Sequence, residues 1–182
     1  MRWYWIDRFL EFESGRRAKA VKNISLAEDH LHDHFPGCPL MPNSLVIEGL
    51  AQTGGLLVCE YNAFEEKVVL AKISKARFYC PALPGDTLTY TTTVDYIKDD
   101  GARISATSHK GDTLHAEAEL MFAHLSDPKL GALFDPETFL RMMCLLRAYE
   151  VGRAADGSPL VPPPRLLQAA GLDDDYGQET VE

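Results

Sequence analysis

The side chains best suited to chemistry gather in one stretch, "HLHDHFPGCPLMPNSLVIEGLAQTGG", which begins at His30. Three histidines, His30, His32 and His34, precede a proline- and glycine-rich loop, and Glu48 follows alone in an apolar run. Histidine exchanges protons near neutral pH, so the cluster suits a metal site, an acid–base site or an exposed surface. An ionised carboxylate buried without partners is costly, so Glu48 should be paired, partly hydrated or shifted toward its neutral form.

A metal site is the weaker interpretation of the three histidines. In a strand they would line one face, but the HxHxDH order of metallo-hydrolases is absent, because Asp33 lies between the second and third histidine. Zinc takes four protein ligands, or three with an open position, and only Asp29 and Asp33 lie nearby. We therefore expect no metal here, and exposed side chains at His30 and His32.

Two other pairings involve His34. A nucleophilic pair with Cys38 is recognised by three-dimensional geometry and not by a spacing of four residues, so we expect a partly buried thiol at Cys38 instead. A pair with Glu48 would bring together two groups of different pKa, as proteins do when they assign acid and base roles. From the residues alone, this pair and a purely structural Glu48, which caps a backbone or binds a lysine, both stay open.

The apolar run around Glu48 predicts a buried helix. Asn43 or Ser44 can cap a helix that extends from Leu45 to about Glu60, and its apolar residues cover nearly every face. The run contains three glycines: Gly49, Gly54 and Gly55. Each disfavours a helix by roughly 1 kcal/mol relative to alanine, which indicates that a sheet or a second copy of the helix packs very close.

The remainder of the first 125 residues predicts antiparallel strands. "WYWIDRFLEFE" and "RAKAVKNISL" flank the turn "SGR" and predict an opening hairpin. Four alternating runs follow: "KVVLAKISKARFYCPAL", "TLTYTTTVDYI", "ARISATS" and "TLHAEAELMFAHL". In the last run His115, Glu117 and Glu119 should face away from the apolar side. The predicted fold class is α+β, with an antiparallel sheet laid against one long central helix.

Composition limits the classes of function. A chain of 182 residues fits one domain with an appendage. The net charge is −9, but the five acids from Asp173 onward leave −9 + 5 = −4 for the rest, which does not indicate a nucleic-acid-binding protein. The four cysteines form no C-x-x-C pair, as expected for thiols in a reducing compartment. No apolar run could span a bilayer, so we expect a cytoplasmic protein without a membrane partner.

The chain changes character after Leu125. "DPETFLRMMCLLRAYEVG" begins with a cap-and-proline pair, Asp135 and Pro136. Its apolar stripe consists of Phe139, Met142, Met143, Leu146 and Tyr149. We predict a body of residues 1–125 and a C-terminal extension of residues 126–182. The extension should contain an amphipathic helix of about 136–151, docked on the body or on a partner subunit, then a proline-rich linker and an acidic flexible tail.

One segment closely resembles a family signature. "HFPGCPLMPNSLVIEGLAQTGGLLV" is similar to the pattern HFPGxPxMPGVLxIEAMAQxxG of the 3-hydroxyacyl-acyl-carrier-protein dehydratases of bacterial fatty-acid synthesis. The separation 48 − 34 = 14 equals that family's spacing between its catalytic histidine and glutamate. The resemblance covers about residues 5–125 and excludes the extension. It implies the hot-dog fold, a sheet wrapped around one long helix, in agreement with the α+β expectation.

The resemblance also implies a reaction. His34 would remove the α-proton of a 3-hydroxyacyl thioester, and Glu48 would position or protonate the departing hydroxyl, giving a trans-2-enoyl thioester and water. The acyl chain would lie in an apolar tunnel beside the helix. No metal and no organic cofactor is implied. The implied partners are an acyl carrier protein with a phosphopantetheine-linked acyl chain, and further copies in a homodimer or a trimer of dimers whose subunits share each site.

Five more residues receive substrate-binding, oxyanion or supporting roles from the resemblance: Phe35, Gly37, Asn43, Ser44 and Gln52. Free N–H groups at the start of the helix suit the thioester oxygen, and Gln52, one turn after Glu48, could hold the glutamate or the water. Asn43 departs from the family, which has glycine there. Asparagine tolerates positive φ better than most residues, so we expect the geometry to survive and substrate choice to differ.

Two alternatives use the same fold. A hot-dog acyl thioesterase would activate water with a carboxylate, and such enzymes generally lack the His-Phe-Pro-Gly loop. A non-catalytic acyl-binding subunit would keep the fold but need neither His34 nor Glu48. Both residues are present, which argues against the second alternative.

Overall fold

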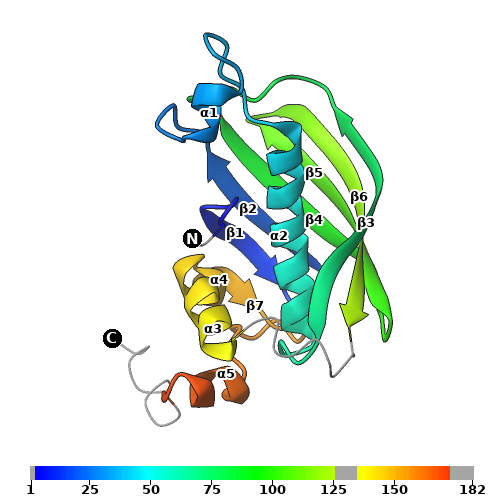
Figure 1. Ribbon diagram of the computed structural model, residues 1–182. Helices are drawn as coiled ribbons and strands as arrows, with labels where there is room; N and C mark the ends of the chain where they lie inside the picture. Colours follow the sequence, from blue (N-terminus) through cyan, green and yellow to red (C-terminus); the bar gives the residue numbers. More distant parts are fainter. Residues whose placement is uncertain (1–2, 126–134, 173–182) are drawn as a thin grey trace.

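The computed structural model describes residues 3–125 and 135–172, in which a curved sheet wraps around one long helix (Figure 1). The strands are β1 (Arg8–Glu13), β2 (Arg17–Asn23), β3 (Lys67–Phe78), β4 (Thr87–Lys98), β5 (Gly101–Lys110), β6 (Thr113–Leu125) and β7 (Gly152–Arg153). The helices are α1 (His30–Asp33), α2 (Asn43–Tyr61), α3 (Pro136–Leu145), α4 (Ala148–Val151) and α5 (Pro164–Ala169). The strand order is β3-β6-β5-β4-β2-β1-β7, and the pairs among β1 to β6 are antiparallel. The predicted α+β arrangement is confirmed.

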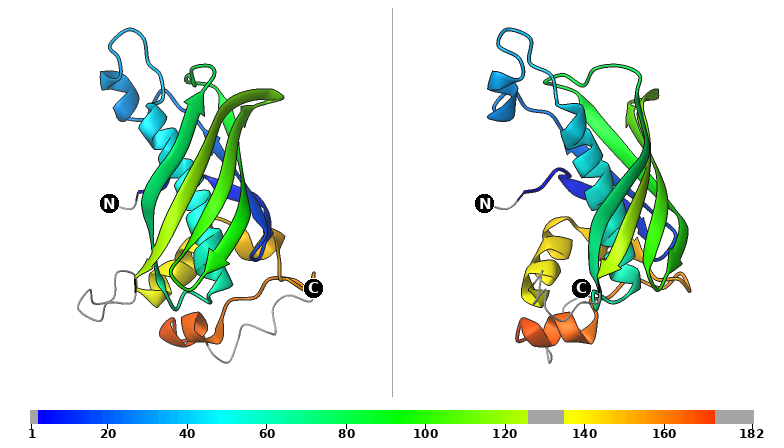
Figure 2. Two further views of the ribbon diagram at one scale, coloured as in Figure 1. Left: turned by 90° about the vertical axis from the view of Figure 1, so that its right-hand side faces the viewer. Right: turned by 45° about the vertical axis from the view of Figure 1, so that its right-hand side comes forward.

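Helix α2 lies in the hollow of the sheet, as Figure 2 shows. Its glycines allow this close approach: a Cβ at Gly49 would collide with the Tyr90 ring, and one at Gly54 would collide with Ile104. Close packing of the sheet against α2 therefore explains why this helix contains glycines. The predicted cap is wrong, because Pro42 occupies the N-cap position and no side chain caps the helix.

Two strand predictions need correction. The opening hairpin begins at Arg8 and not at Trp3, because the backbone of Trp3 and Trp5 bonds to Gln52 of α2 instead of to the sheet. His115 is fully buried, although alternation along β6 placed it on the polar face. The register between β5 and β6 shifts there, from Ser108 opposite Ala116 to His109 opposite Leu114. Such a bulge leaves one residue outside the ladder and re-aims its side chain.

The extension folds against the body in more pieces than expected. Asp135 caps α3 by accepting a hydrogen bond from the Thr138 N–H, as predicted. The single helix predicted over about 136–151 is wrong, because Arg147 adopts a left-handed conformation with φ of +61° and separates α3 from α4. The segment predicted as a linker, "DGSPLVPPPR", buries Leu160 and ends within the first turn of α5. The acidic tail lies outside the described residues.

Strand β7 joins the extension to the sheet. It pairs in parallel with β1, with Phe12 opposite Gly152, while the Phe9 N–H donates to the Leu146 carbonyl. Helices α3 and α5 lie at the C-terminal end of α2, on the concave side of the sheet (Figure 2). Among the described helices, none is both long and apolar enough to cross a membrane.

Candidate active site

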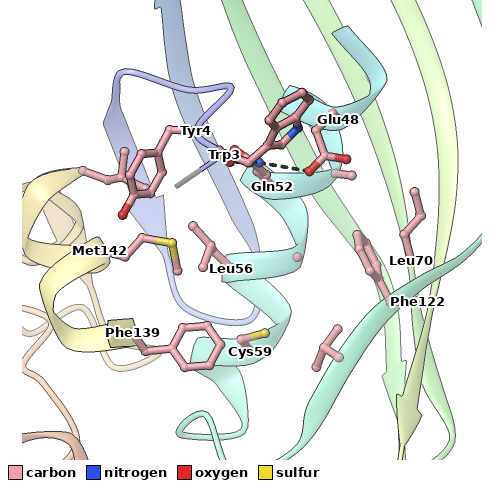
Figure 3. Close-up of a pocket in the computed structure, with 14 residues that line it drawn as sticks. Trp3, Tyr4, Glu48, Gln52, Leu56, Cys59, Leu70, Phe122, Phe139 and Met142 are labelled. Atoms are coloured by element: carbon pink, nitrogen blue, oxygen red, sulfur yellow. Dashed lines mark hydrogen bonds between the residues drawn. The ribbon is translucent and has the colours of Figure 1, made fainter. Parts of the chain in front are cut away.

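Glu48 is held from within helix α2. The Gln52 amide donates to Glu48 Oε1 at 3.0 Å and to the Trp3 carbonyl at 2.7 Å, while Gln52 Oε1 accepts the Trp5 N–H at 2.8 Å (Figure 3). Glutamine one turn after a glutamate lies on the same helix face, so this contact follows from the spacing. Gln52 therefore fixes the carboxylate and attaches the N-terminal segment to α2.

An apolar cavity of about 300 Å³ opens beside Glu48 (Figure 3). Its lining comes from the N-terminal segment, α2, β3, β6 and the extension: Trp3, Tyr4, Glu48, Ala51, Gln52, Gly55, Leu56, Cys59, Val68, Leu70, Phe122, Phe139, Met142 and Leu146. Burial raises the pKa of the Cys59 thiol to about 12, so this side chain stays neutral. The cavity thus has a carboxylate at one place and neutral, mostly apolar side chains elsewhere.

His34 lies on the loop that leads from α1 to α2. Its Nδ1 is 2.9 Å from the Leu40 carbonyl oxygen, and the Leu40 N–H returns a bond to the His34 carbonyl. A carbonyl can only accept, so Nδ1 carries the hydrogen and the neutral ring has its lone pair at Nε2. In this tautomer, Nε2 is the ring nitrogen that can accept a proton.

The rest of this loop is largely solvent-exposed. The Phe35 ring, 54% exposed, stacks on His34 with ring centroids 4.2 Å apart. Phe35 and Cys38 exchange two backbone hydrogen bonds, and Gly37 between them has φ of +77°, a conformation that favours glycine. Cys38 is exposed, so the partly buried thiol predicted there is wrong.

Asn43 and Ser44 occupy the first turn of α2 and are both exposed. Helix geometry gives the first N–H groups no internal acceptor, and the helix dipole makes this end positive. The Leu45 and Val46 N–H groups both turn back to the Pro42 carbonyl. The N–H groups of Asn43 and Ser44 are therefore suited to an oxygen that gains negative charge.

His30 and His32 differ in their surroundings. His32 is exposed, as expected, but His30 packs against Trp5 with ring centroids 5.1 Å apart, and its Nε2 is buried. Exposure of His30 was thus a wrong expectation, and this burial lowers its pKa. In residues 3–125 and 135–172, no group of three His, Cys, Asp or Glu side chains is placed to hold a metal ion.

The structure separates the two principal residues of the motif. Within the described chain, no hydrogen bond or ion pair joins His34 to Glu48, and His34 is not among the cavity residues. Glu48 comes together with Gln52, whereas His34 comes together with Phe35. A single copy thus presents two half-sites.

Sequence analysis missed the contribution of the N-terminal segment. Trp3 and Tyr4 line the cavity, and the backbone of Trp3 and Trp5 binds Gln52. The dense aromatic residues before Arg8 are an available signal, although their alternation predicts a strand. The extension's stripe contributes Phe139, Met142 and Leu146 to the cavity, in line with docking on the body.

Comparisons with known proteins give a consistent result. The profile of the FabA-like domain matches residues 3–117. The chain is 41% identical over 119 residues to the 3-hydroxyacyl-[acyl-carrier-protein] dehydratase FabZ of Desulforamulus reducens, covering 65% of this chain and 84% of that one. It is 42% identical over 119 residues to the FabZ of Symbiobacterium thermophilum, with 65% and 84% covered.

Solved structures show the same fold at lower identity. The dehydratase heterocomplex ApeI:P from Xenorhabdus doucetiae matches with a TM-score of 0.56 and 12% identity, over 70% of this chain and 86% of that one. The fluoroacetyl-CoA thioesterase FlK matches with a TM-score of 0.56 and 14% identity, over 65% and 92%. At these identities the matches support the hot-dog fold alone.

Proposed function

Because the chain belongs to the FabA-like domain family, we propose that it dehydrates 3-hydroxyacyl thioesters carried by acyl carrier protein, giving trans-2-enoyl thioesters in fatty-acid or related lipid synthesis. It is a 3-hydroxyacyl-[acyl-carrier-protein] dehydratase, a hydro-lyase. The observation that carries this function is the position of Glu48 beside an apolar cavity, in a chain that also presents His34 Nε2 as a base.

The proposed mechanism uses His34 and Glu48 as base and acid. His34 Nε2 takes the proton from C2, the C–H electron pair forms the C2–C3 double bond, and the C3–O bond breaks. Glu48 gives its proton to the departing hydroxyl, which leaves as water. Gln52 donates to Glu48 Oε1, so the proton is best placed on Oε2. Proton return from His34 to Glu48, through water, completes the cycle.

Negative charge develops on the thioester oxygen when the C2 proton leaves. Preorganised N–H donors stabilise such an oxygen without reorganising during the reaction. We assign this role to the N–H groups of Asn43 and Ser44, at the positive end of α2. Gly37 lets the loop backbone approach the substrate, and Phe35 supports the His34 ring from one face.

We propose that each site is shared between two copies of the chain. No hydrogen bond or ion pair joins His34 to Glu48 among the described residues of one copy, which motivates the partner subunit's His34 as the base for each Glu48. Strand β3 is the end strand of the sheet, and its residues 70–77 are all exposed. The exposed apolar residues Leu70 and Ile73 of this strand support an interface there. Pairing of β3 with its symmetry mate would give a homodimer, and three dimers could associate further.

The proposed setting follows from simpler features. All four cysteines, each in the described part of the chain, are free thiols, which fits the cytoplasm. The mechanism needs no metal or organic cofactor. Residues 1–125 are proposed as the dehydratase domain and residues 126–182 as an added extension, since the family profile ends at residue 117.

The test is an assay with two readouts. Purified protein is incubated with 3-hydroxybutyryl and longer 3-hydroxyacyl thioesters, on acyl carrier protein and on coenzyme A, while enoyl absorbance and free thiol are followed. We expect enoyl product without thiol release. Thiol without enoyl product would identify a thioesterase, and binding without either product would identify an acyl-binding subunit.

A further inference from the structure

The cavity beside Glu48 is lined in part by a segment of the chain that the family profile does not include. Phe139 and Met142 of α3, with Leu146 just after it, line the cavity, whereas the profile ends at residue 117. Figure 3 shows Phe139 and Met142 facing α2 across the cavity from Leu70 and Phe122. The cavity is therefore formed jointly by the family domain and by this chain's own extension.

Helix α3 has two apolar sides with different partners. Leu140 and Met143 are 3% and 0% exposed and do not line the cavity, so they anchor the helix. Phe139 is fixed by Phe64, whose ring centroid lies 4.9 Å away, and Phe64 is itself buried. The part of the cavity wall that α3 forms is thus anchored by buried side chains.

The cavity follows one face of α2. Glu48, Gln52, Gly55 and Cys59 recur at helical spacing along its lining, with the carboxylate at one end and the neutral Cys59 at the other. The interval 59 − 48 = 11 residues corresponds to roughly 16 Å along the helix axis. Phe139 lies near the Cys59 end, as Figure 3 shows.

We propose that α3 is the end wall of the acyl pocket, and that Phe139 and Met142 set the longest acyl chain that the enzyme accepts. This rests on the proposed function, since it takes the substrate's reacting C3 to lie at Glu48. The occupant is the apolar tail of the thioester, for which the neutral, mostly apolar lining is suited.

Geometry gives the expected limit. A zigzag carbon chain with bonds of 1.52 Å and angles near 111° advances about 1.25 Å per bond. Leaving about 4 Å for contact with the end wall, roughly ten bonds fit beyond C3. Acyl chains of about 12 carbons should therefore fit, and chains of 16 carbons should meet Phe139.

The experiment compares chain-length profiles of kcat/KM for thioesters of 4, 8, 12 and 16 carbons. Each methylene that enters the pocket should raise kcat/KM by up to about fourfold, until the wall is reached. In Phe139→Ala the ratio of the 16-carbon to the 8-carbon value should rise at least about tenfold. The 4-carbon value should stay within about twofold, because that chain does not reach the wall. Leu145→Ala, on the same helix but 61% exposed, is the matched control and should leave the profile unchanged.

Removing a buried ring can unfold a protein, so Met142→Ala provides a second, milder variant. It is only half-buried, and it should shift the profile in the same direction by a smaller factor. A folded Phe139→Ala or Met142→Ala protein with the wild-type profile would overturn the proposal. So would an equal loss at all four chain lengths.

A binding measurement separates this proposal from the proposed function. Saturated acyl-pantetheines of the same lengths cannot be dehydrated, but they should raise the melting temperature of the wild-type protein up to about 12 carbons and not at 16. In Met142→Ala the 16-carbon compound should stabilise as well. Absence of enoyl product with this binding pattern intact would refute the dehydratase function alone. Stabilisation independent of length and variant would refute the end wall alone.

Discussion

Glu48 lies within a helix of 19 residues, where Gln52 fixes its carboxylate and the sheet encloses the helix on its concave side. His34 lies on a loop whose neighbours Phe35 and Cys38 are exposed, and its ring is held by the Leu40 carbonyl and by stacking on Phe35. The part of α2 that carries Glu48, here called the helix half, packs in the core and borders the cavity. The segment around His34, the loop half, projects beyond the N-terminal end of α2 (Figure 1). We propose that it completes the pocket of another copy.

This contrast suggests a division of labour between two regions of one chain. In the proposed reaction the helix half keeps the acid, Glu48, in a fixed position beside the cavity. The loop half needs only a base with a defined tautomer, which the 2.9 Å contact between His34 Nδ1 and the Leu40 carbonyl oxygen supplies. The experiments below test whether the helix half and the loop half act together in this way.

The largest effect is expected from the two proposed catalytic residues. His34→Ala and Glu48→Gln should each lower kcat by at least about 100-fold, because each removes one proton-transfer group. Mixing the two variants under subunit exchange should restore activity. Random pairing makes about half of the dimers mixed, each with one intact site, so roughly a quarter of wild-type activity should return.

Mass measurement of the mixed sample must show exchanged subunits before that result is interpreted. No recovery in an exchanged sample would mean that His34 and Glu48 act within one chain, and the two half-sites would then need a loop movement to meet.

A second, smaller effect should come from strand β3. Ile73→Glu would bring like charges together where β3 meets its symmetry mate, so the protein should become monomeric and lose at least about 90% of its activity. Light scattering and the enoyl assay check both outcomes. Thr113→Glu, at the exposed first residue of β6, is the control. An active monomer would contradict the shared site, since a single copy would then suffice for activity.

Gln52→Ala should have a more moderate effect, confined to the helix half. It removes the donor to Glu48 and the partners of Trp3 and Trp5, so kcat should fall roughly tenfold and stability by about 1–3 kcal/mol. Kinetics and thermal unfolding measure the two effects. Gln168→Ala, on the exposed face of α5, should change neither. Unchanged kinetics in Gln52→Ala would mean that α2 alone orients Glu48.

The smallest expected effect is a loosening of α1 at low pH, next to the loop that carries His34. Burial against Trp5 lowers the pKa of His30 below its ordinary value of 6.5, so a loosened α1 binds the proton more readily than the packed one. The packing of His30 against Trp5 contributes its full stability to α1 above about pH 6.5. This contribution decreases as the pH falls toward the lowered pKa of His30. Amide exchange in α1 should therefore increase below pH 6.5 while that of α2 does not.

His30→Phe keeps an aromatic ring against Trp5 but cannot take up a proton. It should abolish the acid sensitivity of α1, and exchange that still rises in this variant would assign the effect to another group. Glu28 and Lys22 face His30 and also influence its pKa, in opposite directions.

Much of the fold was predictable because its signals are local. The all-round apolar pattern gave α2, and period-two alternation gave the four strands β3 to β6. The residues alone left the His34 and Glu48 pair open, and it could be proposed because its 14-residue spacing matches the family that the motif resembles. The Asp135 cap was likewise read from adjacent residues.

The errors lie where distant residues decide the structure. His30 looked exposed because its partner, Trp5, is 25 residues earlier in the chain. His115 followed the alternation of β6, but a register shift against β5 turns it inward. The segment from Trp3 was assigned to a strand, although Gln52 of α2 takes its hydrogen-bonding groups. No local pattern in the sequence contains these contacts.

The two-residue strand β7 has a consequence for how far such a protein can polymerise. A sheet with two open edges can add copies at both ends and grow into a fibril. Here β7 occupies the edge opposite β3, and the chain beyond it runs through Pro159 and Pro162 to Pro164, which have no N–H for strand pairing. If copies pair through β3, as proposed, that pairing uses up the accessible edge of each copy in a single event. We therefore expect the extension to keep the assembly finite.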